Sequence, residues 1–297
     1  MSNLPTTIAL GILTLLSVTA TIIAWRSLRP SQQGKASHRV TMSLLGTVTT
    51  GSAVLFVIRW WAGGRWAPLD AHVDGLLLIA ALLGVLTLFL RSRAHLPGLT
   101  TFALPLISFV LLWGICASQW TFHGFHIISV WSSLHLASVY VGTALFVIAA
   151  VAGVMYLYAE RRLRSHSGAM PAQRVGSLEA IEKLIIRTSA IGFALLTVAL
   201  ITGFVMWSTE AQKLAPGWWY SRKIVLALVA WLIYAVVMNV RHTTAFRGSR
   251  AAWLSIIGLV LLLGVWMVSV SLPLTAAPAG LKSPTPAGTA YARRESP

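Results

Sequence analysis

Histidine and tryptophan are the residue types in this chain that could hold a metal-bearing ligand, and they gather in the segments between long apolar runs. All eight histidines lie in such segments, and four of them, His72, His123, His126 and His135, lie in those that hold most of the tryptophans. Tryptophans accompany them, among them Trp60, Trp61, Trp66, Trp120, Trp131, Trp218 and Trp219. Aromatic faces beside imidazoles suit a flat, apolar ligand that carries iron, because histidine commonly holds haem iron.

The same residues have a simpler interpretation, which the sequence leaves open. Tryptophans form interfacial belts in membrane proteins, and a histidine such as His135 could be structural and cap the start of its helix. Neither an HExxH motif nor a zinc-type pattern of cysteine and histidine occurs, which argues against a metalloprotease or a structural zinc site. The single cysteine, Cys116, excludes an intramolecular disulfide and a CxxCH haem attachment site.

Membrane-spanning helices are the elements that must position these side chains. The chain is 57% hydrophobic and only 10% charged, and its mean hydropathy is +0.77. A soluble globular chain of 297 residues needs more polar surface than this composition supplies. Composition therefore predicts a multi-span membrane protein.

The segment 131–164 predicts the orientation of the chain. Residues 136–159 carry no charge, and a helix of that length covers about 37 Å, more than the hydrocarbon core of about 30 Å. His135 must then lie at one membrane face, and Arg161, Arg162 and Arg164 at the other. Because clustered arginines mark the cytoplasmic side, we expect His135 at the outer face.

We predict an all-α integral membrane protein of about eight transmembrane helices, with the N-terminus and the C-terminus both outside. Basic residues are more frequent in the segments that this topology places inside. Ser177 as N-cap, with Glu179 in the first turn, indicates a capped amphipathic start before the sixth span. The expected spans cover about 6–25, 40–58, 75–90, 99–117, 136–159, 188–207, 224–240 and 252–272.

The net charge of +16 does not predict nucleic-acid binding. Its basic residues stand in short clusters at the ends of apolar runs, a pattern typical of topology signals and of contacts with anionic membrane lipids. No acidic or basic residue lies deep in any expected span, which argues against an ion-coupled transporter. A small-molecule transporter is therefore the less favoured alternative.

Five stretches of the chain can be compared with known families. They are APLDAHVDGLLL from Ala67, SSLHLASVYVGTALFVIAAVAGVMYLYAERRLR from Ser132, SLEAIEKLIIRTSAIGFALLTVALITG from Ser177, RKIVLALVAWLIYA from Arg222 and FRGSRAAWLSIIG from Phe246. In this order they resemble the CcsA-type cytochrome c assembly proteins, and within that superfamily the HemX/YpjD-like members. The resemblance covers about two thirds of the chain.

The resemblance implies an outer tryptophan-rich segment, the WWD motif, that cradles haem between two outer histidines. His135 matches the first of these histidines and is the candidate ligand of haem iron, and haem b is the cofactor that we expect. Trp218, Trp219 and Tyr220 match the aromatic part of the motif, whereas Ser221 stands where the family has aspartate.

Two further histidines of the family pattern are missing from their positions. Asn239 stands where the penultimate span has an intramembrane histidine, and His242 follows one turn later at the inner face. No histidine follows His242, so a second axial ligand would have to come from His72, His123 or His126. Arg222 could pair with haem propionates or serve as a snorkelling anchor, and Asp74 could cap the third span or orient a ligand histidine.

The expected function is haem handling in cytochrome c biogenesis, by binding or passing haem at the outer face. The alternative is a HemX-like accessory membrane protein that acts through partners without haem. The resemblance implies an assembly factor rather than a stand-alone enzyme, in the cell inner (plasma) membrane, with a second assembly membrane subunit and apocytochrome c as possible partners. We expect two transmembrane helices in residues 1–59, a CcsA-like domain in 60–272 and a disordered tail in 273–297.

Overall fold

The computed structural model describes residues 4–27, 35–63, 69, 72–94, 96–117, 129–164, 175–210, 222–240 and 248–271. Across these ranges the chain folds into long α-helices, as the apolar runs predict. They are α1 (Leu4–Arg26), α2 (Lys35–Gly63), α3 (His72–Ala94), α4 (Leu99–Ala117), α5 (Val130–Arg164), α7 (Leu178–Glu210), α8 (Arg222–Val240) and α9 (Ser249–Ser271).

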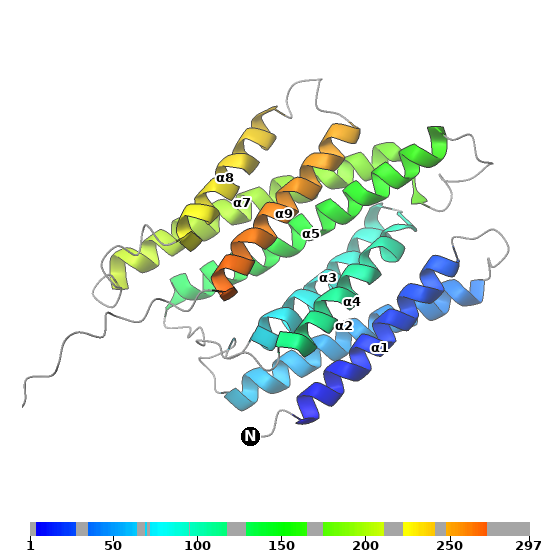
Figure 1. Ribbon diagram of the computed structural model, residues 1–297, viewed down its shortest axis with the longest axis horizontal. Helices are drawn as coiled ribbons and strands as arrows, with labels where there is room; N and C mark the ends of the chain where they lie inside the picture. Colours follow the sequence, from blue (N-terminus) through cyan, green and yellow to red (C-terminus); the bar gives the residue numbers. More distant parts are fainter. Residues whose placement is uncertain are drawn as a thin grey trace, which may run out of the picture.

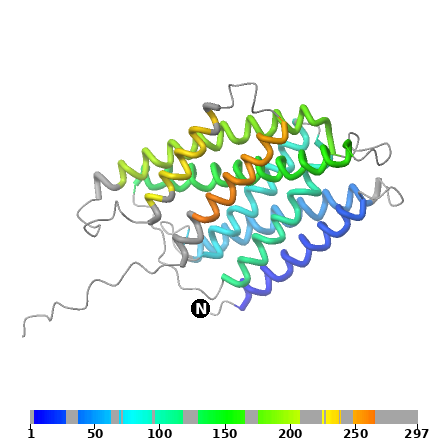
Figure 2. Tube along the Cα trace, turned by 45° about the horizontal axis from the view of Figure 1, so that its top comes forward, coloured from blue at the N-terminus to red at the C-terminus, as the bar shows by residue number. Residues whose placement is uncertain are grey.

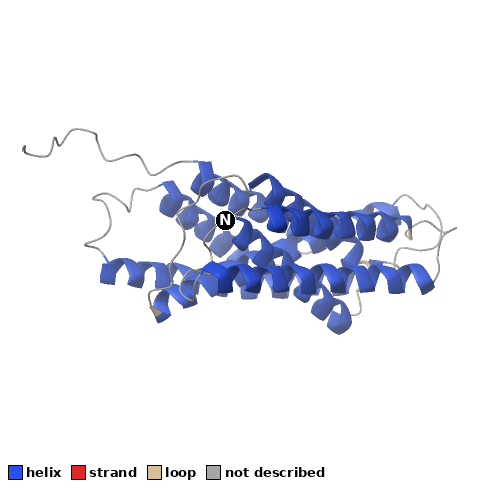
Figure 3. Ribbon diagram, turned by 90° about the horizontal axis from the view of Figure 1, so that it is seen from below, coloured by secondary structure: helices blue, strands red, loops and turns tan. Residues whose placement is uncertain are grey.

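The helices lie side by side in two groups (Figure 1). One group holds α1 to α4, and the other holds α5, α7, α8 and α9. Helix α5 joins the groups, because it packs against α7 and α9 on one side and against α3 and α4 on the other. Seen from below, the helices share one long direction and stack in layers (Figure 3).

Contacts between helix ends show which ends lie together. Arg59 in the last turns of α2 reaches both Thr6 at the start of α1 and Asp74 at the start of α3. Gly75 of α3 packs against the Tyr140 hydroxyl of α5. We call this end of the bundle the His135 end, and the opposite end, where α5 finishes, the Arg164 end.

Helix α9 runs back toward the His135 end. Its start lies at the Arg164 end, where Gly248 has a φ of 72° and its backbone N–H donates to Glu182 of α7 at 3.3 Å. Successive helices therefore alternate in direction along the bundle (Figure 2).

Six helices in the described part of the chain are long and apolar enough to cross a membrane. The class of all-α integral membrane protein is thus confirmed. In α8 and α9 the apolar stretches are shorter, Ala227–Val236 and Ser249–Gly264. The six longer candidates are Leu4–Arg26, Ser37–Ala62, His72–Arg93, Leu99–Ala117, Val130–Arg164 and Leu178–Met206.

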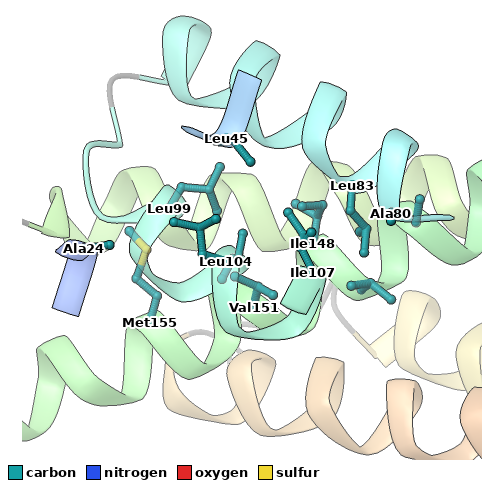
Figure 4. Close-up of a cluster of buried hydrophobic side chains, with 14 of the residues drawn as sticks. Ala24, Leu45, Ala80, Leu83, Leu99, Leu104, Ile107, Ile148, Val151 and Met155 are labelled. Atoms are coloured by element: carbon teal, nitrogen blue, oxygen red, sulfur yellow. The ribbon is translucent and has the colours of Figure 1, made fainter. Parts of the chain in front are cut away.

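Burial is highest in α5, which is consistent with its place between the two groups. Of its most apolar window, 72% is buried within the protein. Ile148, Val151 and Met155 of α5 pack against Leu104 and Ile107 of α4 in the core of the first group (Figure 4). Large apolar side chains on α1, α7 and α9 are instead exposed, as lipid-facing side chains would be.

The start of α5 corrects one expectation. Val130 is the first residue of the helix, so His135 lies in its second turn and does not cap it. Ser129 and Ser132 form the cap: the Ser132 N–H donates to Ser129 Oγ at 3.3 Å, and the Ser129 N–H donates to Ser132 Oγ at 3.0 Å. This reciprocal pairing satisfies two of the amides that a helix start leaves without partners.

The start of α7 confirms the expected cap. Ser177 Oγ accepts a hydrogen bond of 3.2 Å from the Ala180 N–H. The amphipathic start and the sixth expected span form one continuous helix of 33 residues. The helices that exceed their predicted apolar runs most are α2, α5 and α7, because backbone hydrogen bonding continues beyond the last apolar residue.

Candidate functional site

His135 is the candidate ligand whose surroundings the structure describes most fully. Its side chain points from α5 toward α7, where Nδ1 lies 2.8 Å from the Ala199 carbonyl oxygen. Thr202 Oγ1 lies 3.4 Å from the same nitrogen. Gly203 faces the ring so closely that a Cβ atom there would lie 3.2 Å from Cε1.

The contact with Ala199 defines the protonation of the ring. A carbonyl oxygen can only accept a hydrogen bond, so Nδ1 must carry the proton and donate it. The lone pair of the neutral imidazole then resides on Nε2. A backbone carbonyl that holds one ring nitrogen in this way is the usual support of a histidine whose other nitrogen binds metal.

The second described histidine at this end, His72, is the first residue of α3 and is only 9% exposed. Two residues later, the Asp74 carboxylate is paired with the Arg59 guanidinium, which also donates to Thr6 Oγ1 at 3.2 Å. We call Thr6, Arg59 and Asp74 the polar cluster; through Arg59 it ties the ends of α1, α2 and α3 together.

The polar cluster suggests a stability measurement. Asp74→Ala would leave the Arg59 guanidinium, whose side chain is 22% exposed, without its carboxylate at the end of the bundle. We expect the free energy of unfolding to fall by about 2 kcal/mol, below the range for a fully buried pair because water reaches Arg59. Thermal unfolding in detergent measures this.

Glu179→Ala is the matched control for Asp74→Ala, because it removes an exposed acid paired with Lys183 one turn along α7. That pair should contribute little to stability, because water and salt screen two exposed charges. Equal losses of stability in the two variants would contradict the structural role of Asp74.

His135 and α3, which begins at His72, meet different sides of α5. Tyr140 faces α3, since its hydroxyl meets Gly75. His135 precedes Tyr140 by five residues, which turns it about 140° around the helix, toward α7. The His135 ring therefore points away from the face of α5 that meets α3.

The other predicted ligands lie mostly outside the described residues. Arg222 is the first residue of α8, and only its backbone is described. Aromatic side chains do gather at the His135 end, where Trp60, Trp61 and Trp131 are exposed. The predicted residues outside the described ranges are His123, His126, Trp218, Trp219, Tyr220 and His242.

Sequence reasoning did not identify the α7 residues that contact His135. Ala199 contributes a backbone carbonyl, which no side-chain pattern can reveal. Thr202 and Gly203 stand in a run that resembles any apolar span, and the small size of Gly203 is the only signal there. Within the ranges that the structure describes, no group of three or more metal-ligating side chains occurs.

The fold and this site define a helical integral membrane protein with a supported histidine at one end. The sequence model of the cytochrome C assembly protein family matches residues 69–274, and the chain belongs to this family.

Curated relatives share the name cytochrome c biogenesis protein CcsA. The protein from Porphyra purpurea is 25% identical over 291 residues, covering 84% of this chain and 88% of the relative. The protein from Synechococcus sp. (strain CC9311) is 27% identical over 271 residues, covering 80% and 86%. In Synechococcus sp. (strain RCC307), 108 residues are 33% identical, covering 35% and 33%.

Proposed function

We propose that this chain acts in cytochrome c assembly by binding or passing haem at the outer face of the membrane. Its membership of the cytochrome C assembly family and the names of its CcsA relatives support the role in assembly. Haem is the cargo in this proposal. The proposed ligand is His135, and the closer relationship to HemX-like members remains part of the proposal.

The orientation follows from charge. At the Arg164 end, α5 finishes with the exposed residues Arg161, Arg162 and Arg164. Clustered arginines favour the cytoplasmic side, so the His135 end faces outward. With eight crossings, both termini would lie outside the cell inner (plasma) membrane, which is the membrane that we propose.

One observation carries the choice of His135. Its Nδ1–H donates to the Ala199 carbonyl at 2.8 Å, so Nε2 is the ring nitrogen that would bind a metal. The ring is also partly exposed at the end of the bundle, as a ligand to a passing cargo must be. The donor chemistry of this site therefore fits haem iron.

The remaining site residues enter as part of the same proposal. Helix α8 starts at the His135 end, so the preceding Trp218, Trp219 and Tyr220 are proposed to flank the haem, with Arg222 at its propionates. A second ligand is proposed from His72, His123 or His126, and we favour the latter two because His135 points away from the face of α5 that meets α3. His242, beyond the opposite end of α8, is assigned no part at the outer site.

We propose delivery rather than thioether formation as the task of this chain. Ser221 replaces the aspartate of the WWD motif, and the single cysteine provides no thiol pair to prepare an apocytochrome. Apocytochrome c and a second assembly membrane subunit are therefore the proposed partners.

The absorption spectrum of the detergent-purified chain tests the proposal. We expect a Soret band with about one haem per chain, shifting between the oxidised and reduced states. A colourless protein that also fails to bind added haem would leave a membrane accessory protein that acts without haem.

A further inference from the structure

We propose that Thr202 and Gly203 of α7 are positioning residues for His135: they hold its ring in the Nδ1–H form and determine how closely it approaches the α7 backbone. The consequence for haem rests on the proposed function. The effect on the ring concerns only the protein's own residues and can be measured without haem.

The first support is the direction of the hydrogen bonds around Nδ1. The Thr202 hydroxyl lies 2.7 Å from the Val198 carbonyl and 3.1 Å from the Ala199 carbonyl, and it can only donate to them. With its hydrogen so directed, Thr202 Oγ1 presents a lone pair to Nδ1 at 3.4 Å. Nδ1 thus meets two acceptors, Ala199 O and Thr202 Oγ1.

Two acceptors strongly favour one tautomer. If the proton moved to Nε2, Nδ1 would carry a lone pair. That lone pair would face the oxygen of the Ala199 carbonyl at 2.8 Å and the lone pair of Thr202 Oγ1 at 3.4 Å. In the poorly screened end of a membrane bundle this repulsion costs more than in water. The surroundings therefore keep the metal-binding lone pair on Nε2.

The second support is the close approach of the ring to α7. A Cβ atom at Gly203 would lie 3.2 Å from His135 Cε1 and 3.3 Å from Nδ1. These distances are shorter than normal van der Waals contacts, so an added methyl group would push the ring outward. The bond from Nδ1 to Ala199 would lengthen, and the preference for Nδ1–H would weaken.

The inferred consequence is that haem retention depends on residues that do not touch haem. A carbonyl or hydroxyl that accepts from one ring nitrogen raises the basicity of the other and fixes the ring plane. Loss of such support commonly costs 10-fold or more in metal affinity. Gly203→Ala is expected to weaken haem binding by about tenfold, and Thr202→Val by less, because Ala199 O remains.

The test measures the tautomer in the full chain without haem. The protein, labelled with ¹⁵N-histidine and placed in lipid nanodiscs, gives Nδ1 and Nε2 signals whose shifts distinguish the two neutral forms. His135→Ala assigns the signals of His135 by difference. We expect Nδ1–H in the wild type and in Thr202→Ser, which keeps the hydroxyl. Gly203→Ala should show a mixture of the two forms, and Thr202→Val should show a smaller share of Nε2–H, because Ala199 O remains.

Gly264→Ala is the matched control for Gly203→Ala. It makes the same change in α9, where a Cβ atom would meet nothing within 4 Å, and should leave the His135 signals unchanged. An unchanged Nδ1–H signal in both Thr202→Val and Gly203→Ala would overturn the inference. If Gly203→Ala does not fold, Thr202→Val against Thr202→Ser still decides it.

Haem titration of the same variants separates this inference from the proposed function. A wild type that binds no haem would refute the proposed function, while the tautomer shifts would still decide the role of Thr202 and Gly203. If Gly203→Ala binds haem as tightly as the wild type does, the predicted effect on haem retention is refuted.

Discussion

His135→Ala is expected to remove the haem absorption of the purified protein without unfolding it. The Nδ1 atom of this imidazole is held by the Ala199 backbone carbonyl at 2.8 Å. Loss of the ligand itself should cost more than the loss of a supporting residue, so haem affinity should fall by well over about tenfold. Soret absorbance per chain and thermal unfolding, measured on one preparation, separate ligand loss from misfolding.

Two further variants serve as a control and as a rescue experiment for His135→Ala. His38→Ala removes an exposed histidine at the Arg164 end, which contacts Arg91, and should keep the Soret band. His135→Gly with added imidazole should regain the band, because free imidazole can replace the missing ligand. An undiminished Soret band in His135→Ala would refute the assignment of His135 as the haem ligand.

Gly153→Leu is expected to produce the largest loss of stability, because α5 and α9 meet at this glycine. A Cβ atom at residue 153 would lie 2.5 Å from Ser255 Oγ and 2.7 Å from the Ala252 carbonyl oxygen. The carbonyl belongs to the α9 backbone, so it can yield only if the helix moves. We expect the free energy of unfolding to fall by about 3 kcal/mol or more.

The matched control for Gly153→Leu is Gly264→Leu, where a Cβ atom would meet open space. Thermal unfolding in detergent should show a large fall of the midpoint for Gly153→Leu and a small one for Gly264→Leu. Equal midpoints in the two variants would show that α5 and α9 do not approach each other as closely as the structure indicates. Close packing at small residues is a main source of helix association in membranes.

The helices could be predicted because their signals are local. A long run without charge, bounded by arginines, must be a helix in lipid, since every backbone polar group has to be satisfied within the segment. The cap of α7 at Ser177 was predictable for the same reason, because the serine contacts an amide three residues away. The cap of α5 at Ser129 was not predicted, because the residues before it are also uncharged and mostly apolar, so hydrophobicity does not mark where the helix begins.

The surroundings of the candidate site could not be predicted in the same way. Apolar helices have hydrophobic residues on all sides, so periodicity does not reveal which face meets a neighbour. His135 could be recognised by residue type, yet its contact with α7 joins residues 64 positions apart in the chain. The ion pair of Arg59 and Asp74 could not be predicted from the sequence either. In the sequence, each residue alone suggests only a membrane anchor or a helix cap.

The class of protein, the positions of the helices and the proposal of His135 as a candidate ligand could be inferred from residue types and composition alone. That His135 faces α7, that Nδ1 donates to Ala199 and that α3 packs on the Tyr140 side of α5 became visible only in the packed helices. Those facts depend on how the helices rotate and pack against one another. In a membrane, helix packing depends on small residues that let two helices approach closely, as Gly153 does for α5 and α9 and Gly203 does for α7 and α5.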